Sequence, residues 1–198
     1  IAPLFVIGWK AQPGASAKPP TRSSFVSRPD LTPPLLDVTK DGPAAGGYLF
    51  LAAKEKKDPG GPMILDPDGQ LVWFEPIQPK EATDFRVQMW RGKPVLTWWE
   101  GRITRTGVGI GRYVIADQTY RRIAEFGLGN GLTGDLHEFR LTPRGTALVL
   151  AYKPVVRDLT TVGVNKRSWI YDSVVQEVTV PGARVLFEWH SIDHVQLA

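Results

Sequence analysis

The sequence predicts an all-β fold of short antiparallel strands, and three observations support this prediction. First, the 198 residues include 20 glycines and 17 prolines, a composition that suits many turns better than a helical bundle. Second, from Gly47 onward short apolar runs alternate with turn signals, and none shows the 3.6-residue period of an amphipathic helix. Third, the same kinds of residue return at intervals of roughly 50–60 residues, which indicates a structural repeat.

Composition and charge exclude several classes of protein. The chain has 24 Lys and Arg against 20 Asp and Glu, and these residues are scattered, so we expect no nucleic-acid partner. The absence of cysteine excludes disulfides, thiolate zinc sites, iron–sulfur clusters and cysteine nucleophiles. No apolar run approaches the roughly 18 residues of a membrane span. We also expect no metal and no organic cofactor.

Two segments precede the strand-rich region. Residues 1–17 start with a short apolar run and end in Ala15-Ser16-Ala17, which is similar to the tail of a secretory signal peptide. The alternative is an edge strand followed by a loop. If the signal interpretation holds, the protein is secreted or periplasmic. Residues 18–46 lie in a proline-rich stretch, and we predict an extended strap that lies on a folded body.

A first strand at 48–53 is followed by five predicted strand pairs, each joined by a turn. Their ranges are 62–65 with 71–74, 85–90 with 95–99, 113–116 with 122–126, 136–141 with 147–152, and 169–180 with 184–189. The turn at residues 66–69, Asp-Pro-Asp-Gly, is a strong hairpin signal and has too few oxygen ligands for a calcium loop. We expect Trp98 and Trp99 to pack between sheets rather than to stack on sugars.

Two independent markers repeat along these pairs. The first is a glutamate after a hydrophobic residue, with spacings of 50 and 63 residues, at Glu75, Glu125 and Glu188. The second is the opening of a strand, with spacings of 51 and 57 residues, at Arg86, His137 and His194.

A period of this size with four strands per unit is typical of a β-propeller. The alternative, a β-sandwich, would not return the same residue class at the same place in each unit. We therefore predict that residues 47–198 form a partial β-propeller domain of four-stranded antiparallel blades. Because propellers close with about four to eight blades, we expect this chain to be part of a longer protein.

The first strand of each propeller blade lines the central channel, so Arg86, His137 and His194 are predicted to converge on one funnel. The guanidinium fork of Arg86 suits the oxygens of a sulfate or phosphate group. His137 and His194 are candidate nucleophiles, bases or acids near neutral pH. The alternative is that these histidines are structural.

Three further polar residues lie near these positions in the sequence. We interpret His190 as a structural or rim residue. Glu138 adjoins His137 and is expected to pack between blades or to accept hydrogen bonds rather than to catalyse. Asp135 is a candidate for capping or orienting a turn near His137.

Several segments, taken in order, resemble the arylsulfotransferase family (arylsulfate sulfotransferase-like proteins). They are residues 25–34, 92–101, 135–139, 145–148, 175–178 and 187–195. The resemblance implies a six-bladed, typically exported propeller. It also implies transfer of a sulfuryl group from an aryl sulfate to a phenol through a sulfated histidine, without a nucleotide sulfate donor.

In such enzymes further histidines and an arginine bind the sulfate oxygens. The resemblance implies that His137 and His194 are catalytic and that Arg86 binds the substrate. Two other functions stay open. One is an exported, non-catalytic propeller that serves as a binding or scaffold module, and the other is a propeller hydrolase or lyase that uses the same funnel.

Overall fold

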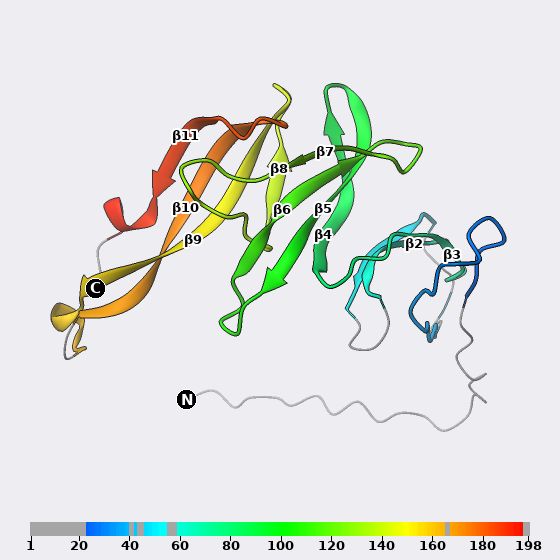
Figure 1. The fold of residues 1–198 in the computed structure, drawn as a ribbon, viewed down its shortest axis with the longest axis horizontal. Helices are drawn as coiled ribbons and strands as arrows, with labels where there is room; N and C mark the ends of the chain where they lie inside the picture. The colour runs from blue at the N-terminus through cyan, green and yellow to red at the C-terminus, as the bar shows by residue number, and fades with distance from the viewer. Residues whose placement is uncertain (1–22, 40–41, 43–45, 55–58, 165–166, 196–198) are drawn as a thin grey trace.

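The computed structural model describes residues 23–39, 42, 46–54, 59–164 and 167–195. Residues 1–17, which resemble part of a signal peptide, lie outside the described residues. The described part of the chain forms eleven strands and two 3₁₀ turns, and no α-helix occurs in it. Three antiparallel sheets lie side by side in chain order (Figure 1). This arrangement confirms the predicted all-β fold of antiparallel blades.

Each blade is a simple meander in which every strand pairs with the next one along the chain. Blade 1 consists of β1 (Leu49–Ala53), β2 (Gly61–Leu65) and β3 (Leu71–Phe74). Blade 2 consists of β4 (Glu81–Trp90), β5 (Lys93–Ile103), β6 (Gly109–Ala116) and β7 (Arg122–Phe126). Blade 3 consists of β8 (Phe139–Leu141), β9 (Thr146–Asp158), β10 (Arg167–Thr179) and β11 (Val185–His190). The 3₁₀ turns are η1 (Thr160–Val162) and η2 (Ser191–Asp193).

The predicted strands differ from the observed ones mainly in length. β4 begins at Glu81 because a β-bulge between Thr83 and Arg86 lets the pairing continue beyond the predicted start. β8 begins only at Phe139, so His137 precedes the strand instead of opening it. His194 follows η2 and is also outside any described strand.

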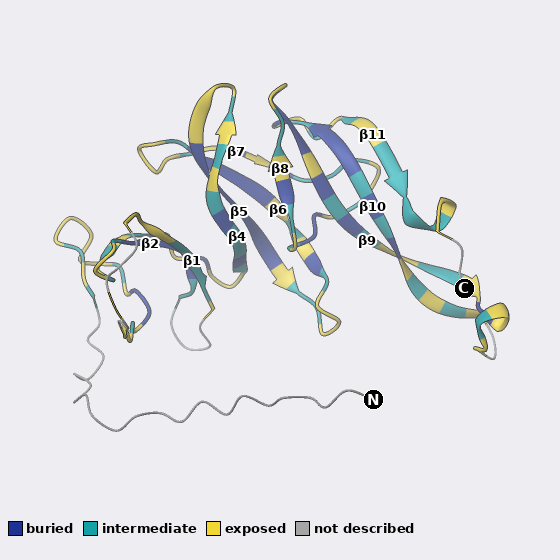
Figure 2. Ribbon diagram, turned by 180° about the vertical axis from the view of Figure 1, so that it is seen from behind, coloured by how far each residue is buried: buried dark blue, intermediate teal, exposed yellow. Residues whose placement is uncertain are grey.

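The two faces of blade 2 form separate cores with its neighbours. Trp98 and Trp99 are both fully buried, and consecutive strand residues point to opposite faces. Trp98 packs toward blade 1 with Phe85 and Ile64, whereas Trp99 packs toward blade 3 with Tyr113 and Phe139. Figure 2 shows the buried residues concentrated along β5 and β6, the two central strands. The tryptophan pair therefore packs between blades, as expected.

The face of blade 1 that points away from blade 2 is covered by the proline-rich segment. Phe25 and Leu36 of this segment pack against the buried side chains of Met63, Leu65 and Phe74. Pro33 and Pro34 are also buried. The described part of this segment thus contributes apolar contacts to the body of the protein.

The first strands of the three blades are neighbours in space. β4 contacts β1 on one side and β8 on the other. The inner edges of consecutive blades therefore face a common region, as a propeller channel requires. Among the described residues, no helix is long and apolar enough to cross a membrane.

Candidate functional site

A cluster of five polar residues lies where β4 meets the segment that leads into β8. Its members, called the inner-strand cluster below, are Asp84, Arg86, Asp135, His137 and Glu138. Two of the three site residues that the sequence predicts, Arg86 and His137, belong to it.

Arg86 joins blade 2 to blade 3 through one nitrogen. Its Nη2 donates hydrogen bonds to Glu138 Oε1 at 2.5 Å, to the backbone oxygen of Phe139 at 2.5 Å and to Asp84 Oδ2 at 3.2 Å. Its Nε is buried and has no hydrogen-bond partner. Glu138 is thus a hydrogen-bonding partner, as expected, and two carboxylates offset the charge of Arg86.

Asp84 occupies an unusual backbone and electrostatic position. Its φ of 54° lies in the left-handed region, which costs a non-glycine residue about 1–3 kcal/mol. Its carboxylate accepts hydrogen bonds from Arg86 and from the backbone nitrogen of Phe139. Burial raises the pKa of this carboxyl to about 6, although the charge of Arg86 acts in the opposite direction. Asp84 lies within the β-bulge between Thr83 and Arg86, where the regular alternation of strand side chains is interrupted, so the spacing of the two residues does not by itself identify the pair.

The imidazole of His137 is held by a fully buried carboxylate. Asp135 Oδ2 accepts from His137 Nδ1 at 2.5 Å and from the His137 backbone nitrogen at 3.0 Å. The other oxygen, Oδ1, accepts from the backbone nitrogen of Gly109 at 2.7 Å. With the proton on Nδ1, the lone pair of the neutral ring is on Nε2, and the side chain is 53% exposed. Asp135 therefore orients the imidazole itself and not only a turn.

Tyr113 on β6 fixes the backbone beneath this pair. Its buried hydroxyl donates to the carbonyl oxygens of Asp135 at 2.9 Å and Leu150 at 3.2 Å. Burial raises the pKa of the hydroxyl, so the group stays protonated and remains a donor. The segment that carries His137 is thus anchored to both blades.

Aromatic side chains continue from His137 along the β9–β10 hairpin. The ring of Tyr152 lies edge-on to His137 at a centroid distance of 6.0 Å, and Tyr171 lies edge-on to Tyr152 at 6.0 Å. The hydroxyl of Tyr171 is 3.1 Å from Thr106 Oγ1 on blade 2. An apolar surface therefore adjoins the exposed imidazole.

His194 lies at the other edge of blade 3. It follows β11 and η2, and its ring stacks on Trp189 with a centroid distance of 5.2 Å. β11 and β8 are the two edge strands of this sheet, and η2 lies far from β4 in Figure 1. The structure brings Arg86 close to the segment of His137, and no contact between described residues adds His194 to this group.

His190 is enclosed by carboxylates. Its Nδ1 is 2.5 Å from Asp172 Oδ2, and its Nε2 is 3.1 Å from Glu188 Oε1. Both interactions raise the pKa of the imidazole, with Asp172 contributing most. Because neither ring nitrogen is left for a substrate, these contacts support the structural interpretation of His190.

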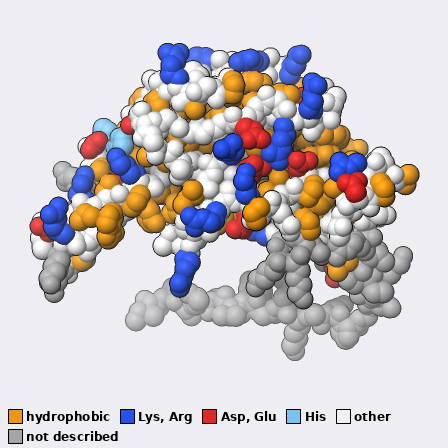
Figure 3. Space-filling model, viewed as in Figure 1, with side chains coloured by type: hydrophobic (Ala, Val, Ile, Leu, Met, Phe, Trp, Pro, Cys, Tyr) orange, Lys and Arg blue, Asp and Glu red, His pale blue; other side chains and the backbone are white. Residues whose placement is uncertain are grey.

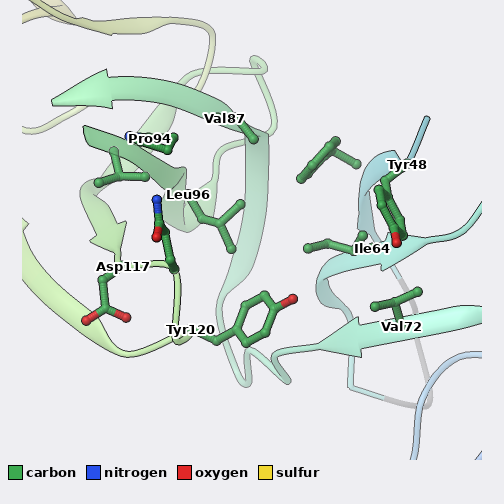
Figure 4. Close-up of a pocket in the computed structure, with 11 residues that line it drawn as sticks. Tyr48, Ile64, Val72, Val87, Pro94, Leu96, Asp117 and Tyr120 are labelled. Atoms are coloured by element: carbon green, nitrogen blue, oxygen red, sulfur yellow. The ribbon is translucent and has the colours of Figure 1, made fainter. Parts of the chain in front are cut away.

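Two hollows flank β4. A polar groove of about 510 Å³ runs along the inner edges of β4 and β8 and is lined by Arg86, Gln88, Arg91 and Arg140 among others. On the opposite face of β4, an apolar cavity of about 320 Å³ separates blade 1 from blade 2. Val87 and Leu96 face Ile64, Val72 and Tyr48 across it (Figure 4).

The charges on the surface are mixed. Lys and Arg spread over the face shown in Figure 3, with Asp and Glu among them. Within the described ranges, no three His, Asp or Glu side chains gather closely enough to hold a metal ion.

Comparison with known proteins adds one match. A family model described as arylsulfotransferase (ASST) matches residues 86–197, a range that starts at Arg86 and includes His137 and His194. The chain matches no curated protein and no solved structure.

Proposed function

Because the chain belongs to the arylsulfotransferase family, we propose that it transfers a sulfuryl group from an aryl sulfate ester to a phenolic acceptor, with His137 as the nucleophile. The observation that carries this proposal is the contact of His137 with Asp135. A buried carboxylate 2.5 Å from Nδ1 leaves Nε2 as the reactive, exposed nitrogen.

The proposed reaction has two steps. In the first, the Nε2 lone pair forms a bond to sulfur while the bond from sulfur to the aryl oxygen breaks, and the departing phenolate takes a proton from water. In the second, the oxygen of the acceptor phenol attacks sulfur, the nitrogen–sulfur bond breaks and the acceptor loses its proton to water. No nucleotide donor is needed.

Asp135 and Arg86 support this chemistry in different ways. The negative charge of Asp135 stabilises the positive imidazole ring that forms in the first step. Sulfuryl transfer passes through a loose transition state, as phosphoryl transfer does, so positioned cations contribute strongly. We propose that Arg86 supplies such a cation, moderated by Asp84 and Glu138, and that Tyr152 packs against the aryl ring.

A second candidate function is an exported, non-catalytic binding module. The apolar cavity between blades 1 and 2 favours it, because apolar hollows with a few polar groups are the usual form of ligand sites (Figure 4). Export itself is a proposal that rests on the pattern of residues 1–17.

The test uses 4-nitrophenyl sulfate as donor and phenol as acceptor. We expect release of 4-nitrophenol that depends on the acceptor, and His137→Gln should lower it by about 100-fold or more. Asp135→Asn should also lower it, since the ring loses its orientation. The control is Arg121→Gln, which changes a side chain that is 79% exposed in the β6–β7 turn.

His194→Gln tests the remaining predicted site residue. A loss equal to that of His137→Gln would show that both histidines serve one site. Unchanged transfer would restrict catalysis to His137. If the native protein releases no phenol from any of a panel of aryl sulfates, the binding module becomes the better description.

A further inference from the structure

The groove along β4 and β8 is rich in cations and has no carboxylate in its lining. Three of its lining residues, Arg86, Arg91 and Arg140, carry guanidinium groups. The rest of the lining is neutral. A groove of this composition attracts anions.

Two of these three arginines have no carboxylate partner. The guanidinium of Arg91 lies over the ring of Trp90 at 4.4 Å, and its Nη2 reaches only the backbone oxygen of Val180, at 3.5 Å. Arg140 is exposed, and its side chain forms no hydrogen bond or ion pair with any of the described residues, although its charge helps to lower the pKa of Asp84. Arg86 differs, because Asp84 and Glu138 offset its charge. The guanidinium groups of the groove that form no ion pair with a described carboxylate are therefore those of Arg91 and Arg140.

The strands that carry these arginines are fixed to one another. Gln88 on β4 accepts from the backbone nitrogen of Leu141 on β8 at 2.9 Å and donates to Thr97 at 2.9 Å. Stacking on Trp90 also restricts Arg91, so less side-chain entropy is lost when a ligand binds. The groove is thus largely preformed.

We propose that Arg91 and Arg140 bind an oxyanionic group at the end of the substrate opposite to the transferred sulfuryl group. This inference rests on the proposed function, and it assigns the substrate class as aryl esters that carry a second anionic group. The guanidinium fork binds carboxylate, sulfate and phosphate oxygens in pairs. Because a strand rises about 3.3 Å per residue, the four steps from Arg86 to the end of β4 at Trp90 span roughly 13 Å, and Arg91 follows in the turn. An elongated bis-anion fits this length better than a single-ring monoanion does.

The test compares two probes of equal ring content. Biphenyl-4-yl sulfate has one anionic group, and 4′-carboxybiphenyl-4-yl sulfate has a second one at the far end. Binding to His137→Gln protein is measured by calorimetry, so that no turnover occurs. We expect the carboxylated probe to bind about tenfold more tightly or better at physiological ionic strength.

Arg140→Gln and Arg91→Gln should each reduce this preference while binding of biphenyl-4-yl sulfate stays the same. Arg105→Gln, which removes an exposed arginine outside the groove, is the matched control and should keep the preference. Equal affinities for the two probes, no binding of either, or a preference that survives Arg140→Gln would overturn the proposal. A failure of sulfuryl transfer alone, with the preference intact, would count against the proposed function instead.

Discussion

Among single residues, Asp84 combines backbone strain with a costly charge. Its left-handed φ is tolerated better by Asp and Asn than by most side chains. Its carboxyl is largely buried, with 13% of the side chain exposed, and this burial raises the pKa from 3.8 to about 6. The folded state therefore binds a proton more tightly than the unfolded state does.

This proton linkage gives a stability prediction. The stabilisation from Asp84 is fully present below the unfolded pKa of 3.8 and is lost as the pH rises through about 6. Since one pKa unit corresponds to about 1.4 kcal/mol, the loss is at most ~3 kcal/mol. Asp84→Asn keeps the backbone preference and removes the titration. We expect the unfolding free energy, measured with urea from pH 4 to 7, to depend less on pH.

Asp37→Asn, a change of an exposed residue, is the matched control and should keep the native pH profile. His190 contributes with the same sign, because its pKa is also raised, and this contribution should persist in Asp84→Asn. A profile identical to that of the native protein would show that Asp84 does not titrate in this range.

The sequence predicted part of the inner-strand cluster. Arg86, His137, Glu138 and Asp135 were identified because they lie near a repeated strand opening. Asp84 was missed, and so was Arg140 of the neighbouring groove. The bulge that turns Asp84 toward Arg86 has no clear sequence signal, and the free charge of Arg140 is visible only when its neighbours are known.

At the scale of elements, the repeated glutamates form ion pairs at the strand ends. Arg122, the first residue of β7, contacts Glu75 of blade 1 and the buried Glu100 of β5, both at 3.1 Å. It also contacts Glu125 at 3.0 Å and lies over the ring of Trp98. Arg122 thus connects blade 1 with three other residues of blade 2.

Arg122→Ala should destabilise the protein by about 3 kcal/mol or more, because it removes the main partner of a buried carboxylate. Arg112→Ala removes only a pair with the exposed face of Glu125 and should cost less than about 1 kcal/mol. Urea unfolding of both variants at neutral pH gives the comparison. If both variants lose the same unfolding free energy, Lys80, which also contacts Glu100, is a sufficient partner for that buried carboxylate.

Strand positions were predicted well and strand ends poorly. Turn residues and alternating apolar residues located each hairpin. The extension of β9 to Asp158 was missed because Pro154 interrupts its pattern, and proline is tolerated there since β9 has passed the end of the short β8. β8 is short because contacts of Asp135 organise the residues before it.

At the scale of the whole molecule, the repeat period predicted the blades, because a sheet with two apolar faces needs a neighbour on each. The period could not predict where His194 lies. A spacing of 57 residues indicates a repeat, but it does not fix how the chain leaves β11. The predicted convergence of three side chains therefore depended on loop paths that the sequence does not specify.

The contact between blades 2 and 3 can be tested by removing one hydroxyl group. Tyr113→Phe removes a buried hydroxyl that serves two carbonyl oxygens, so we expect a loss of about 1–3 kcal/mol in unfolding free energy. Tyr120→Phe is the control, because its hydroxyl is bound by none of the described residues and the side chain is 43% exposed. The two variants should differ clearly in urea midpoint, and equal midpoints would contradict the role of Tyr113.

The neighbour-to-neighbour packing of the blades has a consequence for biosynthesis. β4 packs on β1 and β2, and β8 packs on β4, so each new sheet finds its partner in the stretch of chain made just before it. In a chain of this kind each blade packs on the blade that precedes it, and domains form from the N-terminal end as the ribosome adds residues. Blade 2 can therefore close on blade 1, which already carries the covering of Phe25 and Leu36, before blade 3 is complete.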